Sequence, residues 1–184
     1  VEIAKSFGAK VLIEEWKGYA AQKNSALDQA SGDWILSLDA DEELDAELQQ
    51  ALIDLLQALD RLSVLGGQVV AHPHGAGSTP NADARLGTDF DGLLIPRKNE
   101  FLGRWIRHGG YWPDPKLRLF RRGSGKFEDR AVHEDIQIEG MTRQIQSGAL
   151  LHHSYPTLSD YVEHMNRYSS LGAEMVAAEG NVRF

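Results

Sequence analysis

The alternation of apolar and polar positions in the first sixty residues predicts strands and helices in turn. A short strand is predicted over residues 9–14, and a helix over 19–30 that ends in a Ser-Gly-Asp turn. The apolar run at 34–38 has so little alternation that it predicts a strand buried on both faces. Leucines recurring on one face predict a second helix over about 45–59. This order of elements indicates an α/β fold with at least partly parallel strands.

The rest of the chain contains one interruption and three further strands. Residues 66–91 are rich in Gly and Pro and weakly apolar, which predicts a long flexible surface loop. Strands are then expected at 93–96, 117–120 and 148–153.

A final helix is predicted after the last strand. Thr157, with Asp160 three residues later, forms a capping-box pattern that begins this helix. Its apolar residues recur at helical spacing and are expected to pack against the core. This stripe consists of Leu158, Tyr161, Val162, Met165, Tyr168, Gly172, Met175 and Val176.

Composition and charge narrow the function classes. A chain of 184 residues that is 42% hydrophobic and 25% charged is ordinary for one globular domain. The net charge of −8 argues against general nucleic-acid binding. Residues 1–60 hold 13 acids and 4 lysines, whereas residues 97–122 hold 8 Lys/Arg and 2 acids. An acidic segment followed by a basic one suits a substrate with phosphate groups. Without cysteine there is no disulfide, which is compatible with a reducing cytoplasm.

The candidate chemistry begins where the predicted strand at 34–38 ends. Asp39 and Asp41 flank one small residue there, beyond the carboxyl end of a strand, where open α/β sheets bind ligands. Both carboxylates could converge on one hard cation, which could neutralise a diphosphate leaving group. Alternatively, these acids only cap the helix that follows. The pattern alone leaves both interpretations equally open.

Two further segments contain residues that are competent for catalysis. Glu134 and Asp135 follow a histidine and could supply a general base, although alone they read more simply as a surface turn. One of His152 and His153 could complete a metal site with Asp41, although paired core histidines are the simpler interpretation.

Taken in order, these segments form a recognisable set. The segments of this set are residues 19–27, 34–42, 95–104, 116–121, 132–134 and 150–155. It resembles the family-2 inverting glycosyltransferases with a GT-A fold, most closely the lipopolysaccharide-core enzymes that add glucose to an inner-core heptose. The resemblance implies that 1–184 is a single catalytic domain, an α/β/α sandwich with a mixed, mostly parallel central sheet.

The resemblance also implies roles for particular residues. A sugar would pass with inversion from a nucleotide-sugar, with a UDP-sugar favoured, to a saccharide or lipid-linked acceptor in cell-envelope synthesis. Mg²⁺ or Mn²⁺ would be held by Asp39, Asp41 and His152. Glu134, or Asp135 beside it, would deprotonate the acceptor. The donor would be bound by Lys23, Asp39, Arg118 and Arg121. The acceptor would be bound by Arg97, Asn99, Arg104, Arg107 and Trp112.

Three expectations concern the chain as a whole. Val1 lies in what reads as the end of a helix, so we expect a fragment whose first strand, with the base-binding turn after it, precedes this residue. The expected location is the cytoplasm or the inner face of the membrane, with peripheral contact through regions outside this chain. The alternatives are a non-catalytic relative that binds a nucleotide or glycan, and a haloacid-dehalogenase-type phosphatase. Glu43 argues against the phosphatase, because that family has Thr or Val there.

Overall fold

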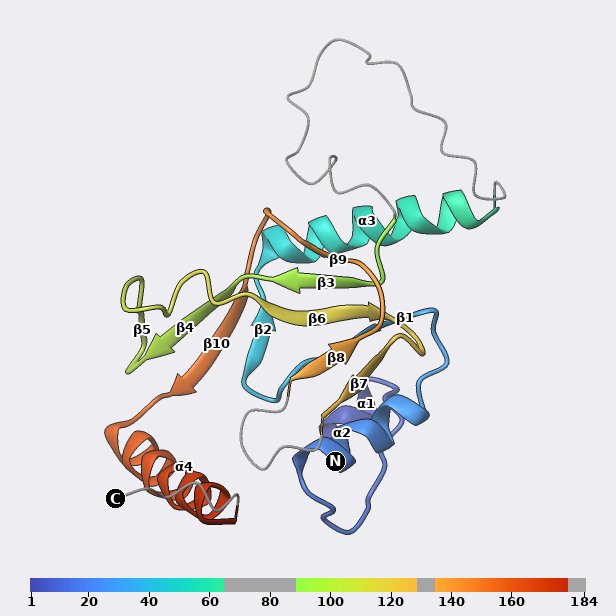
Figure 1. The fold of residues 1–184 in the computed structure, drawn as a ribbon. Coiled ribbons are helices and arrows are strands. Elements are labelled where there is room, and N and C mark those ends of the chain that lie inside the picture. The colour runs from blue at the N-terminus through green and yellow to red at the C-terminus, as the bar shows by residue number, and fades with distance from the viewer. Residues whose placement is uncertain (65–88, 129–134, 179–184) are drawn as a thin grey trace.

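The computed structural model describes residues 1–64, 89–128 and 135–178 (Figure 1). The helices are α1 (Glu2–Ser6), α2 (Tyr19–Asp28), α3 (Ala46–Val64) and α4 (Leu158–Ala178). The strands are β1 (Trp34–Leu36), β2 (Glu42–Leu44), β3 (Gly92–Ile95), β4 (Arg97–Phe101), β5 (Arg104–Trp105), β6 (Lys116–Arg121), β7 (Gly125–Phe127), β8 (Ile136–Ile138), β9 (Thr142–Gln144) and β10 (Leu150–Tyr155).

The strands form two four-stranded sheets and one hairpin. Sheet A has the order β1-β6-β3-β9, sheet B has the order β2-β10-β4-β5, and β7 pairs with β8. Five of the seven pairings are antiparallel, and only β3–β9 and β4–β10 are parallel. The predicted α/β class and mixed pairing are therefore confirmed, whereas a mostly parallel central sheet is wrong for the described residues. One reason is the two-residue turn Leu102-Gly103, with positive φ at both positions, because so tight a link joins only antiparallel strands.

The main core lies between α3 and sheet A (Figure 1). Its buried residues are Leu48, Ala51, Leu52, Phe90, Leu93, Ile95, Leu119, Ile145 and Leu150. Asp45 caps the helix, because its Oδ1 accepts a 2.9 Å hydrogen bond from the Leu48 backbone N–H. The helix predicted near 45–59 is confirmed and extends further, to Val64.

Three predicted elements differ in the structure. Residues 9–14 form no strand. The predicted strand at 34–38 is shorter and half-buried, with Leu36 and Leu38 37% and 38% exposed, because β1 is an edge strand of sheet A. The predicted loop at 66–91 lies mostly outside the described residues. However, Phe90 near its end is 2% exposed and belongs to the core.

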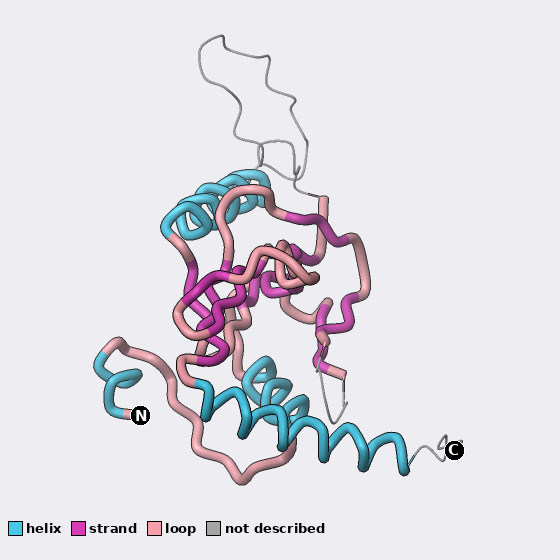
Figure 2. The backbone as a smooth tube through the Cα atoms, turned by 90° about the vertical axis from the view of Figure 1, so that its left-hand side faces the viewer, coloured by secondary structure: helices cyan, strands magenta, loops and turns pink. Residues whose placement is uncertain are grey.

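The final helix begins as predicted but packs differently. Thr157 and Asp160 form the reciprocal capping box: the Thr157 backbone N–H donates to Asp160 Oδ2 at 3.1 Å, and the Asp160 backbone N–H donates to the Thr157 hydroxyl at 3.2 Å. Figure 2 shows α4 at the opposite end of the molecule from α3. It contacts the end of sheet B through aromatic rings, including Tyr161 at 5.2 Å from both Phe101 and Tyr155.

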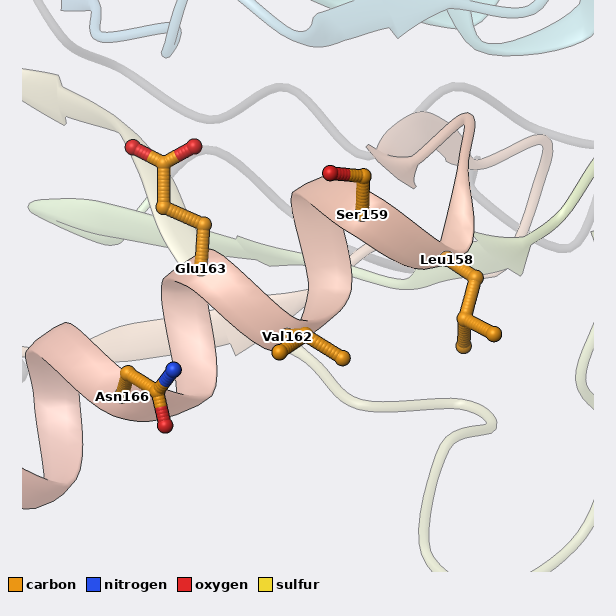
Figure 3. A pocket seen from close by; sticks show the side chains of 5 residues that line it. All are labelled: Leu158, Ser159, Val162, Glu163 and Asn166. Atoms are coloured by element: carbon orange, nitrogen blue, oxygen red, sulfur yellow. The ribbon is translucent and has the colours of Figure 1, made fainter.

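Much of the apolar stripe of α4 is exposed. Leu158 is 59% exposed, and Val162, Met165 and Val176 are each 48% exposed. An open hollow of about 510 Å³ lies on this face, and all of its lining residues belong to α4. Figure 3 labels them. The expectation that this part of the stripe packs in the core is wrong, because the helix turns only its aromatic side toward the sheet.

Candidate active site

Three neighbouring strands of sheet B place one polar side chain each in a single row. His152 of β10 lies opposite Glu42 of β2 on one side and opposite Asn99 of β4 on the other. Directly opposed residues point to the same face of a sheet, so these three side chains share one face. His153 points to the other face, where its Nδ1 lies 2.8 Å from Glu100 Oε2. The tandem histidines therefore have separate environments.

The predicted pairing of Asp41 with His152 is present. The loop 37–41 leads from β1 to β2, and Asp41 Oδ2 lies 3.3 Å from His152 Nε2. The hydrogen bond and the positive charge of a protonated His152 ring hold the pKa of Asp41 below its usual value, against the opposing effect of partial burial. The His153 backbone N–H donates a 2.9 Å hydrogen bond to the Asp41 carbonyl, which fixes the loop against β10. The Asp41 side chain is still 48% exposed, so a ligand can reach it.

Both oxygens of Asp39 are occupied by cationic side chains. Oδ1 lies 2.8 Å from Lys23 Nζ, and Oδ2 lies 2.7 Å from an Arg118 nitrogen. Burial favours a raised pKa for Asp39, but the Lys23 hydrogen bond and the two positive charges outweigh it and lower the pKa. The structure thus unites the predicted donor residues Lys23, Asp39 and Arg118. Because both Asp39 oxygens already contact cationic side chains, Asp41 and His152 are better placed than Asp39 to bind a metal ion.

Glu42 is a central residue that sequence reasoning missed. Its side chain is fully buried, and Oε1 lies 2.6 Å from Arg118 and 3.3 Å from Arg97. Its Oε2 accepts a 3.1 Å hydrogen bond from the Asp39 backbone N–H. Glu42 therefore holds the loop and both arginines at once. The available signal was its position two residues before Leu44, which also packs inward.

The predicted acceptor residues Arg97 and Asn99 are largely occupied by internal contacts. Asp114 Oδ2 lies 2.8 Å from both the Arg97 Nη2 and the Asn99 Nδ2. Asn99 is only 7% exposed, so little of it is left to contact an acceptor. Nothing in the sequence pattern singled out Asp114.

A second group of predicted acceptor residues surrounds Trp105 at the edge of sheet B. Arg107 lies over the Trp105 ring at 4.5 Å, and Trp112 packs edge-on against it at 5.1 Å. Arg104 and Arg107 are exposed. Sequence reasoning missed Trp105, which the basic residues around it mark as part of the same surface.

Arg121 is not brought to this site. It lies three residues from Arg118 on β6, so the two side chains point to opposite faces. Its guanidinium lies over the Trp34 ring at 4.8 Å, and its Nε lies 3.7 Å from Asp91.

Of the two candidate bases, Asp135 directly precedes β8. Glu134 is outside the described residues. Asp135 is exposed, and its carbonyl accepts a 3.2 Å hydrogen bond from the Glu128 N–H. The adjacent Phe127 lies under Lys23 Nζ, 5.1 Å from the ring centre. This end of the hairpin is thereby linked to Asp39 through Lys23.

The described residues supply an incomplete metal site. Among them, no group of three or more His, Asp or Glu side chains is placed to hold a metal ion. The pair Asp41 and His152 offers one oxygen and one nitrogen. This donor set fits Mg²⁺ or Mn²⁺ bound partly by substrate phosphates, since Mg²⁺ usually takes one or two carboxylates and keeps its other positions for phosphate and water.

Comparison with known proteins assigns the family. Residues 1–124 match the model of glycosyl transferase family 2. This chain belongs to that family. The family predicted from the ordered motifs is therefore confirmed.

Known relatives of this family-2 chain are longer. It is 32% identical over 174 residues to the lipopolysaccharide core biosynthesis glycosyltransferase LpsC of Rhizobium meliloti (strain 1021), covering 93% of this chain and 53% of the relative. It is 50% identical over 52 residues to an uncharacterized glycosyltransferase of Rickettsia typhi, covering 28% of this chain and 18% of that protein. A TPR repeat-containing protein of Synechococcus elongatus is 31% identical over 151 residues, covering 73% of this chain and 36% of that protein. The chain thus spans about half of LpsC.

None of the described helices of this chain has the length and apolar character needed to cross a membrane.

Proposed function

We propose that this chain is the donor-binding and catalytic part of a metal-dependent, inverting glycosyltransferase. The observation that carries the proposal is the 3.3 Å approach of Asp41, on the exposed 37–41 loop, to His152 of β10. The cations Lys23 and Arg118 lie beside them on Asp39. A nucleotide-sugar donor and a saccharide acceptor are general to the family.

The donor end of the reaction needs positive charge. Mg²⁺ or Mn²⁺ held by Asp41 and His152 would neutralise charge on the diphosphate leaving group. Lys23, whose side chain is 27% exposed, can exchange its contact with Asp39 for one with a phosphate oxygen. The buried Arg118 stays with Glu42 and keeps the loop in place.

The acceptor end needs a base. The acceptor hydroxyl oxygen attacks the anomeric carbon from the face opposite the diphosphate, and the bond from that carbon to the diphosphate breaks. The hydroxyl proton passes to Glu134, or to Asp135 beside it. The contacts that link Asp135, through Glu128 and Phe127, to Lys23 support a base close to the donor.

The acceptor is proposed to be a saccharide of the cell envelope. The name of the Rhizobium meliloti relative, lipopolysaccharide core biosynthesis glycosyltransferase, supports this class. Around Trp105, the exposed Arg104 and Arg107 offer cations for acidic groups, and the partly buried Trp112 offers an aromatic face for a sugar ring. We propose a UDP-sugar donor and a cytoplasmic location, with peripheral membrane contact through regions outside this chain.

A thermal-shift panel tests the donor and metal together. UDP, GDP, ADP and CMP are each added with and without Mn²⁺, and we expect UDP with Mn²⁺ to stabilise the protein most. A ligand at a hundredfold excess over its Kd adds about 2.7 kcal/mol to the free energy of unfolding. Asp41→Asn should remove the Mn²⁺-dependent part of the shift and Mn²⁺-dependent sugar transfer.

Glu43→Gln is the matched control, because Glu43 is a neighbouring acid that points away from His152 and is 69% exposed. It should behave as the wild type. Full Mn²⁺-dependent transfer by Asp41→Asn would refute the metal assignment.

A further inference from the structure

We infer that Asn99 is a positioning residue that fixes the imidazole tautomer of His152, so that the lone pair of Nε2 faces Asp41. The inference rests on the proposed function in one respect, namely that a cation binds between Asp41 and His152. It goes beyond that function by assigning the orientation of the imidazole to a buried amide on another strand.

The orientation of the Asn99 amide follows from its other contacts. Its Nδ2 lies 2.8 Å from Asp114 Oδ2 and 3.1 Å from the Tyr111 carbonyl oxygen. Both partners are acceptors. Asp114 Oδ2 also accepts hydrogen bonds from Arg97 at 2.8 and 3.1 Å, which keep it ionised. A flipped amide would set its oxygen against two acceptors, so the Asn99 Oδ1 must point the other way.

That oxygen lies against His152. The distance from Asn99 Oδ1 to His152 Nδ1 is 2.6 Å, which requires a hydrogen between the two atoms. An amide oxygen cannot donate, so His152 Nδ1 carries the hydrogen. In the neutral ring Nε2 is then an acceptor, and it faces the Asp41 carboxylate at 3.3 Å. Two electron-rich atoms this close favour a shared cation.

Ser154 is the other side chain that contacts the same nitrogen. Its hydroxyl lies 2.9 Å from His152 Nδ1 and can either donate or accept, so it does not select the tautomer. The opposite tautomer would place the Nδ1 lone pair 2.6 Å from the Asn99 oxygen, with two acceptors in contact. Metal-binding histidines are commonly oriented through the second ring nitrogen in this way.

The tautomer can be measured without metal. Long-range ¹H–¹⁵N spectra of the imidazole nitrogens are recorded on the metal-free protein at about pH 8, above the ordinary histidine pKa. A His152→Gln spectrum assigns the His152 signals. We expect wild-type His152 to carry its proton on Nδ1 and to show an unprotonated Nε2. A wild-type ring protonated on Nε2 overturns the inference, whatever any variant does.

Two variants separate positioning from general structural support. Asn99→Leu should give a mixture of tautomers. Ser154→Ala, which removes the other contact to the same nitrogen, should leave the tautomer unchanged. A Ser154→Ala spectrum that changes tautomer, with an unchanged Asn99→Leu spectrum, would assign the role to Ser154 and overturn the inference.

A Mn²⁺ titration links the tautomer to the metal. Binding is measured by the loss of the electron paramagnetic resonance signal of free Mn²⁺. Loss of such an orienting partner typically weakens metal affinity by about 10- to 100-fold. We expect that loss for Asn99→Leu and not for Ser154→Ala. Wild-type binding that depends on Asp41 but is unaffected by Asn99→Leu would refute the positioning role and leave the proposed function intact. Absence of Mn²⁺ binding by the wild type would refute the metal site, while the metal-free spectra still decide the tautomer.

Discussion

Glu42 shows how one buried acid organises the candidate site. Its carboxylate is completely shielded from solvent and bonds Arg118, Arg97 and the backbone at Asp39. Glu42→Gln would leave two guanidinium groups without their shared counter-ion in a buried setting. Removing one partner of a buried ion pair typically costs about 3–5 kcal/mol, and we expect a loss in this range.

Urea unfolding measures this loss. Glu43→Gln on the same strand serves as the control, because its side chain is 69% exposed, and it should change the free energy of unfolding by less than about 0.5 kcal/mol. Equal small losses for the two variants would show that Glu42 contributes no more than a surface acid.

The junction of α3 with β10 depends on a glycine. Gly148 has φ +72°, and a Cβ there would come within 2.1 Å of the Leu48 backbone nitrogen, which belongs to the capped first turn of α3. Gly148→Ala should therefore lower the free energy of unfolding by more than the about 1–2 kcal/mol that a left-handed conformation costs. Urea denaturation of the variant gives the value.

Gly172 in α4 is the matched control. It lies inside a helix with open space around the position of a Cβ, so Gly172→Ala should raise the free energy of unfolding by about 0.5–1 kcal/mol. A Gly148→Ala variant as stable as the wild type would mean that β10 can move away from α3 at little cost.

The sequence predicted the helices better than the sheet. Helices can be predicted from local patterns, such as the Thr157 capping box and the leucine face of α3, and both are present in the structure. Strand order depends on contacts between distant residues, so the antiparallel pairing of β1 with β6 had no local signal. The exposed half of the α4 stripe was misassigned for the same reason, because periodicity gives a face but not its partner.

The candidate site was predicted as a set of residue types and not as a network. Asp41 and His152 were expected together because carboxylate and imidazole ligands suit one ion, and the structure places them 3.3 Å apart. The internal roles of Arg97 and Asn99 could not be read, because they depend on Asp114 from a loop with no pattern of its own. A charged residue in a sequence looks the same whether it binds a substrate or a buried counter-ion.

The molecule places its candidate site where its two larger sheets join. β1 belongs to sheet A and β2 to sheet B, and the loop between them carries Asp39 and Asp41 (Figure 1). Arg118 of sheet A contacts Glu42 of sheet B and so ties the two sheets together at this loop. The stability of the fold and the geometry of the site therefore depend on the same ion pairs.

Ionised groups of this kind make the stability of the whole molecule depend on pH. Burial favours a raised pKa for Asp114, but hydrogen bonds from Asn99 and Arg97 and the positive charges of Arg97 and Lys116 outweigh it and lower the pKa. A lowered carboxyl pKa adds stability above the ordinary value of about 3.9, and this contribution is lost as pH falls through the lowered value. Asp114→Asn should therefore flatten the acid side of the stability curve.

His153 should make the free energy of unfolding depend on pH in the opposite direction. Its hydrogen bond to Glu100 raises its pKa and outweighs the opposing effect of burial, and Glu43 adds a further increase. A raised histidine pKa adds stability below the ordinary value of about 6.5, and this contribution is lost as pH rises through the raised value.

Urea denaturation in metal-free buffer from about pH 3 to 9 tests both groups. The free energy of unfolding should have its maximum between the ordinary pKa values of aspartate, about 3.9, and histidine, about 6.5. His153→Gln should flatten only the alkaline side and Asp114→Asn only the acid side, so each variant is the control for the other. If the stability curves of both variants ran parallel to the wild-type curve, neither group would have a pKa that differs between the folded and the unfolded protein.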